Sequence, residues 1–279
     1  METILVLTDF SDSATNAARY AAAFSRQFAA AKILLYHSYS IAPVVTTVPM
    51  PTHSAIIGLH DASIKKLTEL KTLITPMVKE KTEIEVLTND KPIITAVYSI
   101  AQLYELVLTV VGVTGKSSFE RTLIGSNTLS LVEESISPLL LIPPQAVFVK
   151  IRKVVFASDL KDVYKTSPVA AIKEVIHKLD ANLYLLNVAN GESGNSRMDA
   201  VIEQKDLHKL WDSENAEYHF INNKDIAEGI MEFVSEEDVQ LLIVVPKKRG
   251  FFESIFHRSL TKKLAYHTDL PLLIFKEEE

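Results

Sequence analysis

The sequence predicts an α/β protein made of two tandem copies of one small domain, each with a parallel sheet covered by helices. Short apolar runs of strand length alternate with stretches of helix formers, which is typical of a parallel sheet buried on both faces. The same order of segments occurs twice at nearly constant offsets. The length of 279 residues suits two domains of ordinary size.

Composition narrows the class of protein. Hydrophobic residues make up 47% and charged residues 23%, as in ordinary globular proteins. No apolar run approaches the roughly 18–20 residues that span a bilayer, and the start Met-Glu-Thr-Ile-Leu lacks a basic segment, so we expect neither a membrane partner nor a signal peptide. The chain has no cysteine, which excludes disulfides and thiol catalysis and fits the cytoplasmic location that we expect.

Charge argues against a nucleic-acid partner. The net charge is −6; residues 1–150 carry 12 basic and 13 acidic side chains, and the remainder carries 17 and 22. Neither half is basic, so no nucleic-acid surface is expected.

The elements of the first half follow from apolar runs and breakers. Strands are expected at residues 4–7, 33–37, 83–87, 106–111 and 139–142, and helices at 14–31, 56–81, 93–104 and 129–135. Pro76 should kink or break the second helix. Residues 40–54, rich in Pro, Thr and Val, are expected to form a long loop, and loops of this length are usually functional or mobile.

The second half repeats this order. Residues 154–159 mirror 4–9, and 183–187 mirror 33–37, both at an offset of 150. Residues 244–246 mirror 110–112 at an offset of 134, so about 16 residues are missing from the middle of the second copy. Two prolines, Pro143 and Pro144, stop the last strand of the first copy. We therefore predict domains at 1–146 and 151–279.

Glycines cluster at one point of the first copy. Of its four glycines, three lie within 14 residues, at Gly112, Gly115 and Gly125. The cluster begins where the strand 106–111 ends, and Ser126, Asn127 and Thr128, which follow it, are expected to cap the helix 129–135.

This arrangement suits an anion site. Ligands of open parallel sheets bind outside the carboxyl ends of the strands. Glycines there let backbone N–H groups approach a phosphate, and a helix N-terminus adds donors and a positive dipole end. Ser126 and Thr128 supply hydroxyls, and Lys116 either adds a charge or points to solvent. The structural alternative is that the glycines only make tight turns.

Two further strands end in polar residues on the same edge of the sheet. Asp9 follows the first strand, and His37 and Ser38 end the second. A base or ribose could lie across these strands with its phosphates at the glycine loop. Asp9 could instead cap the following helix, although Ser11 or Asp12 would serve equally well, and His37 could be a structural residue.

These residues resemble the universal stress protein family. Its nucleotide-binding members carry Gly, two residues, Gly, nine residues, then Gly and Ser or Thr, a spacing that residues 112–126 meet. Residues 7–11 and 35–38 are similar to the family's first and second strand ends, with Ser38 where a valine is usual. The resemblance covers both copies.

The resemblance implies two open-sheet Rossmann-like domains, each a five-stranded parallel sheet flanked by helices. It implies ATP as cofactor, with Mg²⁺ as a candidate companion. Asp9 would contact the nucleoside, and the backbone of Ser38 the adenine. The remaining cofactor-binding residues would be Gly112, Thr114, Gly115, Gly125, Ser126, Asn127 and Thr128. The two domains would pair through their last strands as an intrachain pseudo-dimer; whether two chains then form a homodimer stays open.

The second copy departs from the motif. Pro246 and Arg249 replace the first two glycines, and His257 and Arg258 precede Ser259 where the third belongs. Proline has no N–H to donate, so we predict that this copy does not bind ATP in the same way. Its Lys247-Lys248-Arg249 stretch either attracts another anion or is a solvated basic loop, and residues 250–252 could be buried against the other copy.

Three functions compete at this point. The first is an ATP-binding stress or regulatory protein whose output is a change of conformation or partner. The second is a slow ATPase, although no Walker lysine loop, general base or arginine finger is evident. The third is an interaction protein that binds no nucleotide. The dinucleotide fingerprint is absent, because residues 8–11 contain no glycine.

Overall fold

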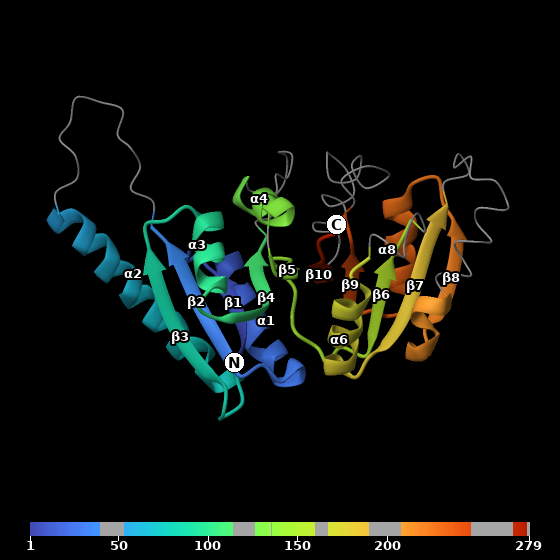
Figure 1. The fold of residues 1–279 in the computed structure, drawn as a ribbon, viewed down its shortest axis with the longest axis horizontal. Coiled ribbons are helices and arrows are strands. Elements are labelled where there is room, and N and C mark those ends of the chain that lie inside the picture. The colour runs from blue at the N-terminus through green and yellow to red at the C-terminus, as the bar shows by residue number, and fades with distance from the viewer. Residues whose placement is uncertain are drawn as a thin grey trace.

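The described residues form one ten-stranded sheet, in the order β3-β2-β1-β4-β5-β10-β9-β6-β7-β8 (Figure 1). The computed structural model describes residues 1–39, 53–113, 126–134, 136–159, 167–189, 208–246 and 270–277. Each half supplies five strands, which pair in parallel within that half. The predicted fold class is confirmed.

The strands of the N-terminal half coincide closely with the predicted apolar runs. They are β1 (Glu2–Leu7), β2 (Lys32–Ser38), β3 (Glu83–Asn89), β4 (Glu105–Gly112) and β5 (Leu139–Ile142). Central β1 pairs with β2 and β4, so Val6 lies between Leu35 and Val110. A strand paired on both sides and covered on both faces must be apolar throughout, which is why it appears as an uninterrupted apolar run.

The C-terminal half repeats this topology. Its strands are β6 (Lys153–Ala157), β7 (Asn182–Ala189), β8 (Glu217–Asn222), β9 (Leu241–Val244) and β10 (Leu272–Ile274). Their order, β8-β7-β6-β9-β10, matches β3-β2-β1-β4-β5 strand for strand. The sequence repeat is therefore a repeat of structure.

The two halves meet at their last strands. β10 pairs antiparallel with β5, and Leu273 lies opposite Leu140 in the register. Both side chains are buried, so the junction is a continuation of the core. The domain boundaries at 146 and 151 stay a prediction.

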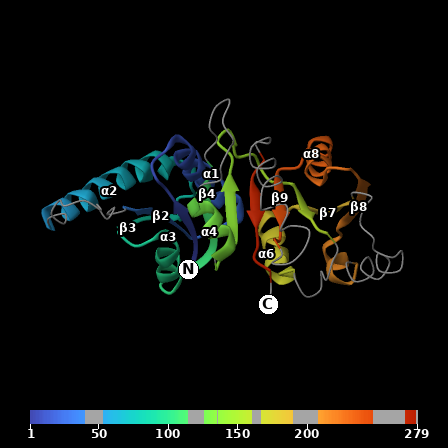
Figure 2. The ribbon, with the colours of Figure 1, turned by 90° about the horizontal axis from the view of Figure 1, so that it is seen from above.

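Helices cover both faces of the sheet. One face carries α1 (Asp12–Phe28), α2 (His53–Ile74) and α6 (Val169–Leu179); the other carries α3 (Ile93–Ala101), α4 (Ser126–Glu134) and α8 (Ile226–Glu236). Figure 2 shows α1 and α2 on one side of the N-terminal strands and α3 and α4 on the other. Alternate residues of β1 point to opposite faces of the sheet. Ile4 and Val6 belong to the core under α1, α2 and α6, and Leu5 and Leu7 belong to the core under α3, α4 and α8.

The four helices of the N-terminal half differ in their bounds from the expected ones, and two of them test a specific prediction. As predicted, the helix before Pro76 stops: α2 ends at Ile74, and a 3₁₀ turn, Thr75–Met77, follows. The prediction that residues 126–128 cap a helix beginning at 129 was wrong, because α4 already begins at Ser126. Small polar residues suit a first helical turn as well as a cap, so the pattern alone could not separate the two. Most of the expected loop at 40–54 lies outside the described residues.

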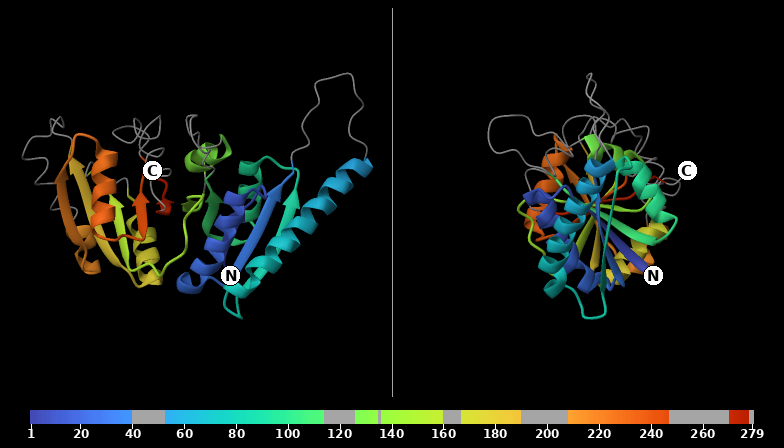
Figure 3. Two further views of the ribbon diagram at one scale, coloured as in Figure 1. Left: turned by 180° about the vertical axis from the view of Figure 1, so that it is seen from behind. Right: turned by 90° about the vertical axis from the view of Figure 1, so that its left-hand side faces the viewer.

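Helix α1 holds the connection between the halves. Asn16 Nδ2 donates to the carbonyl oxygens of Pro143 (3.3 Å) and Ala146 (3.0 Å). Gln27 exchanges hydrogen bonds with the backbone of Ile151, and Phe148 packs edge-on against Tyr20 and Phe24 of the same helix. Figure 3 shows α1 lying next to the junction.

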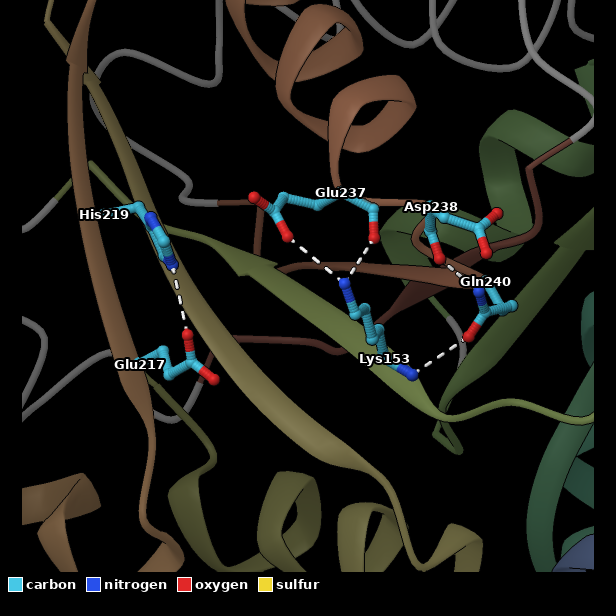
Figure 4. A network of polar contacts seen from close by, with 6 residues as sticks. All are labelled: Lys153, Glu217, His219, Glu237, Asp238 and Gln240. Atoms are coloured by element: carbon cyan, nitrogen blue, oxygen red, sulfur yellow. Dashed lines mark hydrogen bonds and ion pairs between the residues drawn. The ribbon is translucent and has the colours of Figure 1, made fainter.

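A polar network fixes the amino ends of the C-terminal strands (Figure 4). Lys153 Nζ donates to the carbonyl oxygen of Glu237 (2.7 Å) and contacts its carboxylate (3.2 Å). The side chain of Gln240 accepts from the N–H of Lys153 at 2.9 Å. The contacts of Lys153 therefore join the starts of β6 and β9 to the end of α8, which is a structural role. Farther along the sheet, Glu217 lies 3.9 Å from His219 within β8.

Glu214, whose side chain is largely covered, ties the segment before β8 to α6. Its carboxylate meets Lys173 Nζ at 3.1 Å and His177 Nε2 at 2.5 Å, and it accepts from Ser213 Oγ at 2.9 Å. Burial alone would raise the pKa of Glu214, but hydrogen bonds from Ser213, Lys173 and His177 outweigh it and hold the pKa below its ordinary value. The single tryptophan, Trp211, is fully buried beside this cluster.

We expect Glu214→Gln to reduce the free energy of unfolding by about 1–2 kcal/mol at pH 7. A depressed carboxyl pKa stabilises the folded state above the unfolded pKa of about 4.3, and this contribution is lost as pH falls further. The difference between the two proteins should therefore shrink from pH 7 to pH 3.5 in urea titrations followed by Trp211 fluorescence. A gap that stays constant over this range would show that the charge of Glu214 does not carry the effect.

No helix in the described ranges is both long and apolar enough to cross a bilayer.

Candidate functional site

A cleft of about 830 Å³ opens at the carboxyl ends of β1, β2 and β4. This is the edge of an open parallel sheet at which ligands bind, and the size falls within the roughly 300–1,000 Å³ of ligand pockets. Its walls are Leu7, Thr8, Asp9, Ala14, His37, Ser38, Asp90, Lys91, Pro92, Ile93, Ile94, Val111, Gly112, Asn127, Thr128, Ser130 and Leu131.

Five of the predicted site residues meet in this cleft although they are far apart in the chain: Asp9, Ser38, Gly112, Asn127 and Thr128. For Ser126 the structure describes only the backbone, which begins α4. The remaining predicted residues, Thr114, Gly115 and Gly125, lie outside the described residues, as does Lys116.

Gly112 has a packing role that the sequence did not reveal. A Cβ built on it would lie 2.4 Å from the carbonyl oxygen of Ser13 and 2.9 Å from the amide nitrogen of Ala14. Both are backbone atoms of the first turn of α1, which cannot yield as a flexible side chain would. The first glycine of the motif therefore lets α1 dock against the end of β4.

Asp9 is exposed to the cleft and held by its own turn. Its Oδ1 accepts from the N–H of Ser11 at 2.9 Å and from Ser11 Oγ at 2.6 Å. The cap of α1 is Ser11, whose Oγ accepts from the N–H of Ala14. Asp9 itself therefore does not cap α1.

His37 supports this turn from the next strand. Its Nδ1 lies 2.7 Å from the carbonyl oxygen of Thr8, so this nitrogen carries the proton in the neutral ring. Its ring packs on Phe10 at 4.4 Å between centroids. Phe10 has a φ of 66°, in the left-handed region that few bulky residues adopt. These contacts support the structural interpretation of His37. The residue also lines the cleft.

Sequence reasoning missed one wall of the cleft, the turn from β3 to α3. The side chain of Ser38 donates to the carbonyl oxygen of Lys91 at 2.6 Å, joining this turn to the end of β2. Asn89 Oδ1 accepts from both the N–H of Lys91 (3.0 Å) and Tyr36 Oη (2.8 Å). Burial raises the pKa of Tyr36 to about 12, so it donates at neutral pH. The missed signal was a polar Asn-Asp-Lys-Pro turn directly after a strand on the same edge.

The opposite wall is the first turn of α4. Thr128 is buried and Asn127 is exposed, and Ser130 and Leu131 also line the cleft. The first N–H groups of a helix lack partners within it, so this turn is suited to an anion. The described lining holds two carboxylates, Asp9 and Asp90, and one ammonium group, that of Lys91. No cluster of metal ligands occurs among the described residues.

At the corresponding place in the C-terminal half, the described residues line a small pocket. Ser158 and Asp159 follow β6 as Thr8 and Asp9 follow β1, but the pocket beside them measures about 10 Å³. Ile226 and Ile230 of α8 line that pocket. This volume is about the minimum that holds one water molecule.

Fold and site together define a tandem parallel α/β protein with a ligand-sized cleft at the carboxyl edge of its first sheet. The family model of the universal stress protein family matches residues 1–143, half of the chain. The chain belongs to the universal stress protein family, as its motifs predict.

Solved structures share the fold over the whole chain. A universal stress protein from Archaeoglobus fulgidus DSM 4304 superposes with a TM-score of 0.72 at 16% identity, covering 98% of each chain. The protein PA1789 of unknown function from Pseudomonas aeruginosa PAO1 gives 0.59 at 12% identity, covering 100% of this chain and 93% of its own. The cytoplasmic domain of a prokaryotic cation chloride cotransporter gives 0.52 at 9% identity, with 98% and 94% covered. No curated protein sequence matches the chain.

Proposed function

We propose that the N-terminal half binds ATP in this cleft and that the protein is a cytoplasmic stress-response regulator whose output is a change of conformation or partner. The observation that carries the proposal is the convergence of Asp9, Ser38, Gly112, Asn127 and Thr128 on one cleft of about 830 Å³. These residues were singled out because of their place in the glycine motif and at strand ends. Family membership supports the nucleotide as the ligand class.

The chemistry of the walls suits the parts of a nucleotide. A flat base would lie between the end of β2 and the turn that contains Pro92, where Ile93 and Ile94 supply apolar surface. The carboxylate of Asp9 would accept a hydrogen bond from a ribose hydroxyl. The phosphates would lie at the first turn of α4, toward its unpaired N–H groups and positive dipole end.

Mg²⁺ fits this proposal as a companion of the phosphates. It commonly keeps several waters and takes only one or two carboxylates from a protein, the rest from substrate phosphates. Asp9 would be the oxygen donor that holds it, as an alternative to the hydrogen bond with the ribose.

The proposal is tested by isothermal titration of the purified full chain with MgATP. We expect one site per chain, because the second copy lacks the motif. Gly115→Val should abolish binding without unfolding the protein, and Asp9→Ala should weaken it about tenfold or more, the value of a hydrogen bond to a charged group. The matched control is Asp159→Ala, which changes the equivalent aspartate of the second copy and should bind ATP like the unchanged protein.

The same samples separate the competing functions. If ADP accumulates during incubation and Asp9→Ala stops it, the protein is a slow ATPase. If the unchanged chain neither carries nucleotide after purification nor binds ATP, the proposal fails, and an interaction protein without nucleotide is the better description. Two sites per chain would contradict the prediction for the second copy.

A further inference from the structure

Asp9 reaches the cleft from a turn in which its carboxylate is hydrogen-bonded to Ser11. Ser11 Oγ has one proton, and the 2.6 Å contact assigns it to Asp9 Oδ1. The oxygen also lies 3.3 Å from the amide nitrogen of Ala14 and 3.1 Å from Ser13 Oγ. Since its own proton is committed, Ser11 Oγ accepts from both of these groups, and the hydroxyl of Ser13 is the donor.

This pattern fixes the carboxylate of Asp9 in one orientation. Oδ1 receives two hydrogen bonds, from the N–H and the hydroxyl of Ser11. Oδ2 is left as the oxygen with capacity for a ligand, and Asp9 lines the cleft. A carboxylate whose partners are already in place loses less conformational freedom when it binds.

The backbone next to Asp9 is built to permit this turn. The N–H of Ser11 can turn back to Asp9 because Phe10 adopts a φ of 66°. That conformation is held by a hydrogen bond from the N–H of Phe10 to Thr8 Oγ1 (3.0 Å) and by the ring of His37 at 4.4 Å. Lys66 Nζ lies over the ring of Phe10, 5.2 Å from its centroid.

We propose that Ser11 is the positioning residue of the nucleotide site: it orients the carboxylate of Asp9 toward the ligand before the ligand arrives. The inference rests on the proposed function and adds a residue to it. Ser11 also caps α1, so the experiment must separate loss of the cap from loss of the orientation.

A double-mutant cycle makes this separation. We expect Ser11→Ala to weaken the binding of MgATP about tenfold, measured by isothermal titration. The same substitution made in an Asp9→Ala background should change affinity by less than about twofold, because a residue that acts through Asp9 has nothing left to orient. Ser11→Thr keeps the hydroxyl and should restore affinity to within about threefold of the unchanged chain.

Ser13→Ala is the control for the helix start. It removes a donor to Ser11 Oγ but leaves both bonds to Asp9, so it should change ATP affinity less than about twofold. If Ser11→Ala lowers the melting temperature yet binds ATP like the unchanged chain, or weakens binding equally in both backgrounds, Ser11 is a cap only and the inference is overturned. Failure of the unchanged chain to bind ATP would instead overturn the proposed function and this role together.

Discussion

Gly112→Ala is expected to lower the free energy of unfolding by about 3 kcal/mol, the cost of forcing an extra carbon into a packed site. The new methyl would lie 2.4 Å from the carbonyl oxygen of Ser13. Relief requires α1 to move away from β4, and α1 also packs against β1, β5 and, in the other half, α6. For a chain of this size the loss corresponds to a drop in melting temperature of roughly 5–10 °C.

Gly58→Ala is the matched control for this substitution. Gly58 lies within α2, and a Cβ there would meet nothing within 4 Å. Alanine is the better helix former by up to about 1 kcal/mol, so this variant should be slightly more stable than the unchanged chain. Differential scanning calorimetry of both variants decides the matter. Equal melting temperatures for the two variants would mean that α1 can dock on β4 even with a Cβ at position 112.

This result matters for how the glycine motif is interpreted. The sequence assigned Gly112 to a phosphate loop, and that role stays a prediction. The contact with α1 is an independent reason for a glycine at this position. Gly112→Ala should therefore change stability, whereas Gly115→Val should change ATP affinity, and the two measurements separate a packing glycine from a binding one.

Strands were the most predictable part of the fold. A central parallel strand such as β1 is buried on both faces, and only an unbroken apolar run satisfies that environment. The repeat at an offset of 150 then carried the prediction from β1 to β6 without further evidence. Parallel order within each half followed from the alternation of strands and helices.

The parts that were missed depend on contacts between distant segments. The turn at Asp90 and Lys91 looks like any polar turn; it becomes a wall of the cleft because β2 and β3 pair in a register that places Ser38 opposite Asn89. The close approach of Ser13 to Gly112 likewise depends on how α1 docks. No local pattern encodes either distance, although the polar turn after β3 did mark the edge of the sheet on which this wall lies.

Gln27→Glu is expected to be the most damaging substitution at the junction of the halves. Gln27 Nε2 donates to the carbonyl oxygens of Ile151 (2.7 Å) and Leu179 (2.6 Å), while its Oε1 accepts from the N–H of Ile151 at 2.9 Å. Glutamate places a charged oxygen against two carbonyl oxygens in a partly buried site. We expect a loss of about 3 kcal/mol at pH 7 from the repulsion and the lost donors.

The sign of the pH dependence identifies the cause. The folded state disfavours the charged form, so the pKa of the new carboxyl should rise above its unfolded value of about 4.3. The deficit should therefore shrink as pH falls toward 4, where the protonated carboxyl can again donate to one carbonyl oxygen. Urea titrations at pH 7 and pH 4.5 measure this difference. The control, Gln102→Glu at the exposed end of α3, should change stability by no more than about 0.5 kcal/mol at either pH.

The same titrations show whether α1 couples the halves. Trp211 reports on the C-terminal half alone, whereas circular dichroism at 222 nm reports on helices of both. In the unchanged chain the two signals should change together, because β5, β10 and α1 join the N-terminal half to the C-terminal half. In Gln27→Glu the two transitions should separate at pH 7 and move back toward each other at pH 4.5. Coincident transitions at both pH values would mean that the shared sheet, without Gln27, suffices to make the two halves unfold as one unit.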